Sequence, residues 1–111
     1  SLLQEFEEEL TLLGSLHHPH IIRCYGACIS MPNIALVTEF CPNGSISERL
    51  RNIDPNDQST LFSLEQKLTI LYQICSGMIY LNTKNIIHRD LKSDNVLFDS
   101  QDNIKIIDLG V

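Results

Sequence analysis

The fold of this chain is constrained most by residues 86–98, where a densely charged segment lies between two apolar ones. Two isoleucines precede the charges, and a Val-Leu-Phe run follows them. The segment between them carries an imidazole, an amide, two cations and two carboxylates, on His88, Arg89, Asp90, Lys92, Asp94 and Asn95. We therefore predict a very short strand at 86–87, then a charged loop, then a strand that begins at Val96.

Apolar periodicity and capping signals predict three helices. They span approximately residues 1–16, 45–52 and 64–81. The first helix carries an acidic, solvated face over an apolar stripe. Ser45 with Glu48, and Ser63 with Gln66, have the spacing of capping boxes at the starts of the other two. Gly77 inside the third helix indicates that another element approaches it closely.

Two hairpins complete the predicted fold. Their strands are expected at residues 21–29 with 33–40, and at residues 96–98 with 104–107. A Cys-Pro-Asn-Gly turn is expected at residues 41–44, and a polar loop at residues 53–60 follows the second helix. Helices and antiparallel hairpins together define an α+β chain. Its 111 residues suffice for one small domain with a modest core.

Charge and composition exclude some classes of function. Fourteen acidic residues against eight basic ones give a net charge of −6, which argues against nucleic-acid binding through phosphate contacts. No apolar run approaches membrane-spanning length and no basic-then-apolar leader opens the chain, so we expect a soluble, cytoplasmic protein without membrane insertion. The four cysteines lack Cys-x-x-Cys spacing. We expect four free thiols, two or three of them buried in strands or helices.

The charged loop and its surroundings resemble the signature set of protein kinases. The matching residues are His88-Arg89-Asp90, Lys92, Asn95 and Asp108-Leu109-Gly110, with Leu109 where the family usually has Phe. Residues 6–22 look like the family's helix C and its exit to the fourth strand. Residues 35–46 look like its fifth strand, hinge and start of helix D. Residues 76–97 are similar to the tyrosine-kinase-like group of serine/threonine kinases.

This resemblance covers essentially all of the chain and implies a partial protein-kinase fold. Residues 1–40 would form part of the N-lobe, with helix C and the fourth and fifth strands. Residues 41–44 would be the hinge, and residues 45–111 the first part of the helical C-lobe. The glycine-rich loop, the third-strand lysine and the activation segment are absent from the sequence. We therefore expect the chain to be a piece of a longer domain.

The resemblance also implies a reaction, the transfer of a phosphoryl group from ATP to serine or threonine hydroxyls of protein substrates. Asp90 would accept or orient the proton of the attacking hydroxyl, and Lys92 would reach the transferred phosphate. Asn95 and Asp108 would bind Mg²⁺, which prefers hard oxygen ligands. Glu9 would be the helix C glutamate that pairs with the absent lysine.

An ATP site at the hinge is implied as well. Glu39 with its carbonyl, and Cys41 with its N–H and carbonyl, would bind the edge of the adenine base. Thr38 matches the gatekeeper position and Leu97 the floor of the adenine pocket. A regulatory spine would consist of Leu13, Cys24, His88 and Leu109.

Several of these residues have alternative interpretations. We interpret His88 as a packed, hydrogen-bonded imidazole rather than a base. Arg89 either pairs with a local carboxylate or, by resemblance, binds a phosphorylated residue of the activation segment. Three histidines within residues 17–20 could bind Zn²⁺ or Ni²⁺ weakly, although the proline between them and the resemblance favour a structural role. For the whole chain, the alternatives to an active kinase are a pseudokinase or scaffold module without catalysis, and a non-functional truncated product.

Overall fold

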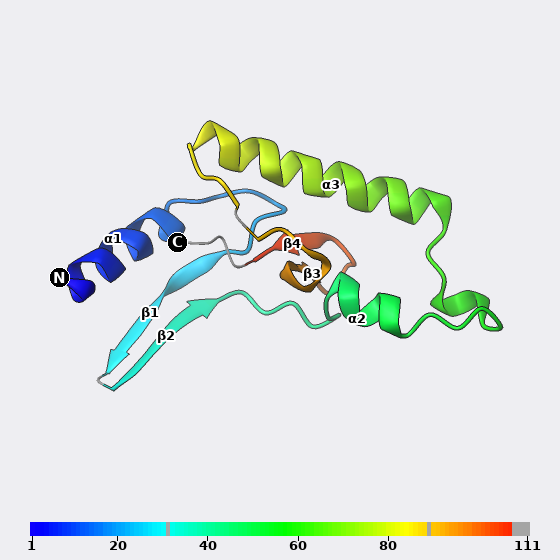
Figure 1. Cartoon of the computed structure of the whole chain (residues 1–111), viewed down its shortest axis with the longest axis horizontal. Coiled ribbons are helices and arrows are strands. Elements are labelled where there is room, and N and C mark those ends of the chain that lie inside the picture. The colour runs from blue at the N-terminus through cyan, green and yellow to red at the C-terminus, as the bar shows by residue number, and fades with distance from the viewer. Residues whose placement is uncertain (31, 89, 108–111) are drawn as a thin grey trace.

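The computed structural model describes residues 1–30, 32–88 and 90–107, and it confirms an α+β chain (Figure 1). The helices are α1 (Leu2–Gly14), α2 (Ile46–Arg51) and α3 (Leu64–Thr83), with short 3₁₀ helices η1 (Gln58–Thr60) and η2 (Ser93–Asn95). The strands are β1 (Cys24–Ser30), β2 (Asn33–Thr38), β3 (Val96–Phe98) and β4 (Ile104–Ile106). The three predicted helices are all present, and the predicted polar loop at 53–60 contains η1.

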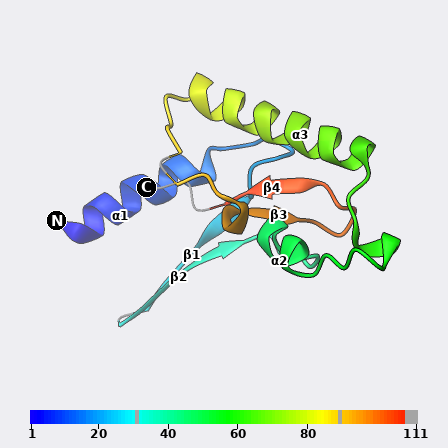
Figure 2. The ribbon, with the colours of Figure 1, turned by 45° about the vertical axis from the view of Figure 1, so that its right-hand side comes forward.

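The four strands form two separate antiparallel hairpins. In the first, β1 pairs with β2 from Cys24 opposite Thr38 to Ser30 opposite Asn33, with a bulge near Gly26. This hairpin extends away from the rest of the chain (Figure 1). In the second, β3 pairs with β4 beneath α3, and the two views agree on this arrangement (Figure 2).

The first strand begins later than predicted, because the segment before it pairs elsewhere. Ile21 forms a parallel bridge with Ile106 of β4, and the Ile22 N–H donates to the Ile106 carbonyl at 3.0 Å. Residues 21–22 therefore join the second hairpin rather than the first. The core is built around this junction, from Leu16, Ile21, Leu81, Val96, Phe98, Ile104 and Ile106.

The predicted strand at 86–87 is wrong, because the end of α3 uses its backbone. Asn85 has a positive φ of 59°, and its N–H donates to the Asn82 carbonyl at 3.1 Å. The Ile86 N–H donates to the Leu81 carbonyl at 2.9 Å. These two bonds form a Schellman motif, in which a left-handed residue ends a helix and satisfies its last carbonyls. Ile86 is thus part of the helix terminus and is not free to pair as a strand.

The two predicted capping boxes differ in the structure. Ser63 accepts from the Gln66 N–H at 3.1 Å, and the Gln66 side chain accepts from the Ser63 N–H at 2.7 Å, so this box is complete. Ser45 accepts from the Glu48 N–H at 3.1 Å, but the Glu48 carboxylate contacts the Ser45 hydroxyl at 3.5 Å instead of its backbone. The capping box of Ser45 and Glu48 is therefore only half formed.

The expectations for cysteines and for membrane insertion can be compared with the described residues. All four cysteines are free, with Cys24 and Cys41 buried and Cys28 and Cys75 exposed. Buried thiols were predicted to lie in strands or helices. Cys24 does, but Cys41 lies between β2 and α2. Within residues 1–30, 32–88 and 90–107, every helix is too short or too polar to cross a lipid bilayer.

Gly77 lies where α3 crosses the core, as its sequence position suggested. A Cβ atom there would lie 3.0 Å from Ile106 Cδ1 and 3.3 Å from both the His20 carbonyl oxygen and Ile21 Cδ1. We expect Gly77→Leu to destabilise the protein by about 1–3 kcal/mol, the usual cost of overpacking. Urea unfolding of the full-length protein would measure it. Cys75→Leu, at an exposed position of the same helix, is the control and should change the midpoint little.

Candidate functional site

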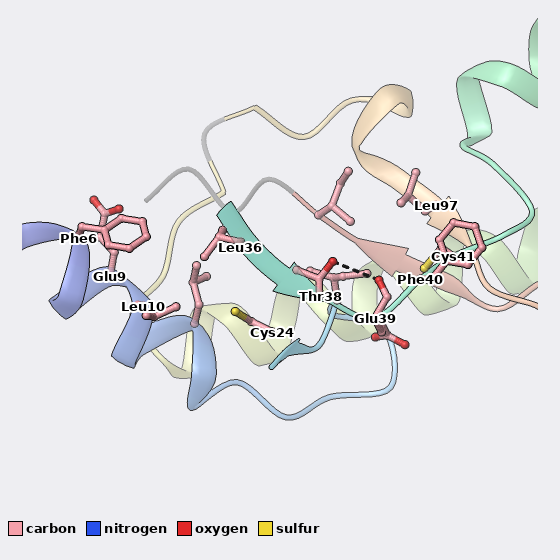
Figure 3. A pocket seen from close by; sticks show the side chains of 13 residues that line it. Phe6, Glu9, Leu10, Cys24, Leu36, Thr38, Glu39, Phe40, Cys41 and Leu97 are labelled. Atoms are coloured by element: carbon pink, nitrogen blue, oxygen red, sulfur yellow. Dashed lines mark hydrogen bonds between the residues drawn. The ribbon is translucent and has the colours of Figure 1, made fainter. Parts of the chain in front are cut away.

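An apolar cavity of about 530 Å³ lies between α1, the end of β2, the segment that follows β2, and β3 (Figure 3). Its size is in the range of small-molecule and cofactor sites. Five of the predicted catalytic and nucleotide-binding residues line it, namely Glu9, Thr38, Glu39, Cys41 and Leu97. The other lining residues are Phe6, Leu10, Leu13, Ile22, Cys24, Leu36, Phe40 and Ile107.

Thr38 lies in the middle of this cavity. On one side of it are Phe40, Cys41 and Leu97, and on the other are Cys24 and the residues of α1 (Figure 3). Its side chain is short, so the two halves of the cavity are continuous. The size of residue 38 therefore sets how far a ligand can extend from the segment after β2 toward α1.

Polar contacts hold both the backbone and the carboxylate of Glu39. Its N–H donates to the Arg23 carbonyl at 2.9 Å, and its carboxylate accepts from the Arg23 N–H at 2.8 Å. The Lys105 ammonium lies 3.4 Å from the same carboxylate oxygen. The Thr38 hydroxyl donates to the Glu39 carbonyl at 3.2 Å. Because Lys105 lies opposite Leu97 in the second hairpin, the ion pair ties this hairpin to the segment after β2.

Cys41 provides the unused backbone groups of the cavity. Among the hydrogen bonds of the described residues, none involves its N–H or its carbonyl. Its side chain is buried, and burial, followed by the nearby Glu39 carboxylate, raises the pKa of the thiol above its usual value. The segment just after it is fixed, because the Asn43 N–H donates to the Phe98 carbonyl at 3.2 Å and the Phe98 N–H to the Gly44 carbonyl at 2.8 Å.

The charged loop is folded back on itself by hydrogen bonds. The Asp90 N–H donates to His88 Nδ1 at 3.1 Å, and the Asn95 side-chain amide donates to the Asp90 carbonyl at 2.8 Å. The backbone of Asp90 is therefore held on both sides, while its carboxylate is exposed and pairs with Lys92 at 3.3 Å. His88 is buried and hydrogen-bonded, as the structural interpretation predicted.

Ile107 connects the loop to the cavity, and sequence reasoning missed it. Its carbonyl accepts from His88 Nε2 at 2.9 Å, its N–H donates to the Asn95 carbonyl at 2.9 Å, and its side chain lines the cavity. The available signal was its place immediately before Asp108. Arg23 and Lys105, which hold Glu39, were also missed, and only the pairing of Lys105 with Leu97 in the predicted hairpin could have indicated a role.

The predicted site residues thus fall into two groups. One lines the cavity, and the other, Asp90, Lys92 and Asn95, lies on the loop outside its lining. Leu13 and Cys24 of the predicted spine both line the cavity. The predictions made for Asp108, Arg89 and Leu109 lie outside the described residues.

The residues between 17 and 20 have a structural role in this arrangement. The His18 ring accepts from the His20 N–H and contacts the Ser76 hydroxyl. The His20 ring bonds the Ile104 carbonyl. These bonds attach the loop between α1 and β1 to α3 and β4. They fit the structural interpretation of the histidines.

Comparison with known proteins gives the family. The model of the protein tyrosine and serine/threonine kinase family matches residues 1–111. A probable serine/threonine-protein kinase of Dictyostelium discoideum is 45% identical over 99% of this chain, which covers 8% of that protein. The serine/threonine-protein kinase STY46 of Arabidopsis thaliana is 37% identical over 99% of the chain and 18% of its own length. The serine/threonine-protein kinase STE11 of Saccharomyces cerevisiae is 36% identical, over 99% and 14% respectively.

This chain therefore belongs to the protein tyrosine and serine/threonine kinase family. It spans less than a fifth of the length of each of these relatives. Its helices and small antiparallel hairpins form part of the protein-kinase fold.

Proposed function

We propose that the protein containing this chain transfers the γ-phosphoryl group of ATP, with magnesium, to serine or threonine hydroxyls of proteins. The observation that carries the proposal is the loop that gathers Asp90, Lys92 and Asn95, bonded through Ile107 to the wall of an apolar cavity. Serine/threonine kinases similar over nearly the whole chain support the same reaction. Phosphoryl transfer requires mainly positioning and charge neutralisation, and this arrangement can supply both.

The cavity fits the adenine half of ATP. Its lining is mostly apolar, as a flat base requires, and the unused N–H and carbonyl of Cys41 face no competing partner among the described residues. The Glu39 carbonyl retains a second lone pair beside the one that Thr38 occupies. We propose that these backbone groups bind the base edge and that Leu97 lies against the face of the base. Residues 41–44 would then be the hinge between residues 1–40 and residues 45–111.

The charged loop can supply one oxygen ligand to a magnesium ion. Because the Asp90 carbonyl can only accept, the NH₂ group of Asn95 faces it, and the amide oxygen of Asn95 is left for another partner. A hard oxygen donor on a fixed backbone suits Mg²⁺. We propose that Asn95 and Asp108 bind the ion, whose chemistry is to neutralise the phosphate oxygens.

The exposed groups of the loop would then act on the transferred phosphate and its acceptor. Asp90, whose backbone is fixed on both sides, would take the proton of the attacking hydroxyl. Lys92, 3.3 Å from that carboxylate, would place a positive charge at the phosphate. Glu9 lies on the α1 wall of the cavity, where a lysine of the longer domain would meet it.

The proposal is tested by incubating the full-length protein with Mg²⁺ and ATP labelled in the γ-phosphate, together with protein substrates. Acid hydrolysis of the labelled products should give phosphoserine or phosphothreonine. ATP binding without any transfer would instead support the pseudokinase alternative, and phosphotyrosine alone would contradict the proposed substrate class.

Thr38→Met should divide the cavity without closing it to ATP. The longer side chain would fill the middle of the cavity, while the base-binding groups of Cys41 stay in place. Compounds that extend toward Cys24 and Leu36 should lose affinity by about 5- to 150-fold, which corresponds to overpacking by 1–3 kcal/mol. The dissociation constant of ATP should change little. Calorimetric titration of both ligands into the full-length variant measures this, and equal losses would contradict the placement of Thr38.

A further inference from the structure

The loop between α1 and β1 places Leu16 and Ile21 in the core, and its histidines attach it further to α3 and β4. The His17 N–H donates to the Tyr80 hydroxyl at 2.8 Å, which ties the loop to α3. The Ile106 N–H donates to the His20 carbonyl at 2.9 Å, and the His20 ring bonds the Ile104 carbonyl at 3.0 Å, which ties it to β4. Helix α1 has no buried residue of its own. It contacts β1, and Leu13 packs against the core, so this loop is one of several supports of its position.

His18 lies at the centre of this attachment, and both of its ring nitrogens are used. Nδ1 accepts from the His20 N–H at 3.0 Å, and Nε2 lies 3.2 Å from the Ser76 hydroxyl of α3. The ring packs 5.0 Å from the Tyr80 ring and 5.7 Å from the His20 ring, between centroids. A nitrogen that accepts from a backbone N–H carries no proton, so the neutral ring must carry its proton on Nε2 and donate it to Ser76.

The surroundings of His18 do not favour a positive charge. His20 lies beside it on the loop, and Lys105 approaches from β4. The ammonium of Lys84, which follows α3, lies 5.6 Å from the Tyr80 ring. Among the hydrogen bonds and ion pairs of the described residues, none joins His18 to a carboxylate. The Lys105 ammonium is itself paired with the Glu39 carboxylate.

The His17 ring is exposed and contacts the guanidinium of Arg23, which is also on the loop. Burial, followed by His20 and Lys105, holds the pKa of His18 below its ordinary value of 6.5. The direction agrees with the hydrogen-bond geometry, in which only the neutral ring can accept at Nδ1.

We propose that His18 is a pH-sensitive latch, which holds residues 17–20 against α3 at neutral pH and releases them on acidification. Protonation places a hydrogen on Nδ1, directly facing the N–H of His20, so that two donors oppose each other. It also adds a positive charge near the Lys105 ammonium. Release would loosen α1, and with it the wall of the cavity that contains Glu9.

The sign of the effect follows from proton binding. The released loop binds a proton with the ordinary histidine pKa of 6.5, whereas the attached loop binds it only at lower pH. Attachment is therefore fully stable above about pH 6.5 and weakens as the pH falls from there toward the lower pKa of the attached state. Between these two values, each pH unit favours release by up to about tenfold.

The latch is tested by amide hydrogen exchange of the full-length protein between pH 7.5 and 5, corrected for the intrinsic exchange rate. The protection factor of the His20 amide should fall by up to about tenfold per pH unit below 6.5. In His18→Asn the side-chain oxygen can still accept from that amide but does not titrate, so the protection factor should stay constant. His17→Asn, at the exposed neighbouring position, is the control and should retain the wild-type profile.

Identical profiles for the wild type and His18→Asn would overturn the latch. An independent measurement needs no variant, namely an NMR titration of the His18 ring in the wild-type protein. A pKa below 6.5 is expected, and a pKa at or above 6.5 would also overturn the proposal. Neither readout requires nucleotide, so failure of the latch and failure of the proposed kinase reaction are distinguishable.

Discussion

Asp90→Asn in the full-length protein should slow phosphoryl transfer by about 10²- to 10⁴-fold, the usual contribution of a positioned general base. The substitution keeps the shape of the side chain and removes its ability to take a proton. The backbone of residue 90 is held by His88 and Asn95, whose bonds do not involve the carboxylate. The carboxylate is exposed and outside the lining of the cavity, so ATP affinity should be nearly unchanged.

A matched control is available on the same loop. Asp94→Asn removes the same charge from another exposed carboxylate that is not in the kinase motif, and it should leave the rate within about twofold of the wild type, as expected of surface substitutions. Single-turnover transfer with saturating Mg-ATP separates the chemical step from binding. Equal rates for Asp90→Asn and the wild type would remove Asp90 from the reaction.

The 111 residues expressed alone should fold poorly and self-associate. Their radius of gyration is 15.8 Å, whereas a compact domain of this length has about 13 Å. Only nine apolar residues of the described chain are buried. The hydrophobic stabilisation from so small a core does not offset a conformational-entropy cost of roughly 1–2 kcal/mol for each ordered residue. The shape in Figure 1, with the first hairpin and α1 extending from one end, reflects this small core.

Two apolar surfaces would drive the association. One face of α3 exposes Leu64, Leu68, Leu71, Tyr72 and Ile79, each by more than half. The first hairpin exposes Ile29, Ile34, Leu36 and Val37, and an isolated two-stranded hairpin is marginal in water. Apolar patches of this kind on one molecule favour contact with another.

Urea unfolding followed by circular dichroism, with light scattering for size, measures this outcome. We expect a broad, non-cooperative transition and particles larger than a monomer. A monomer with a cooperative transition would show that these 111 residues fold independently despite their exposed apolar faces.

Locally determined features could be predicted from the sequence. The starts of α2 and α3 follow from serine caps, because a cap is a contact between residues three apart. The close approach at Gly77 followed from a glycine in an otherwise good helix. The kinase motif placed Asp90, Lys92 and Asn95 on one loop, because their separation along the chain is short.

Features that depend on tertiary pairing could not be predicted in this way. Residues 21–22 look like the start of a strand, but their partner, Ile106, is distant in sequence. Ile86 and Ile87 are apolar enough for a strand, but a left-handed Asn85 commits the first of them to the end of α3. The contacts of Lys105 with Glu39 and of His88 with Ile107 likewise join distant segments, so their residue types alone did not reveal them.

We propose that the cavity beside Cys41 holds the nucleotide used by the charged loop, and amide hydrogen exchange of the full-length protein with and without Mg-ATP is the most direct test. We expect bound Mg-ATP to slow exchange at residues 39–41, above all at the unused Cys41 N–H, and at residues 95–98. A second cavity of about 500 Å³, between α2 and the start of α3, provides an internal comparison and should be unaffected. Unchanged exchange at residues 39–41 under saturating Mg-ATP, or protection confined to the second cavity, would show that the cavity beside Cys41 is not the nucleotide site.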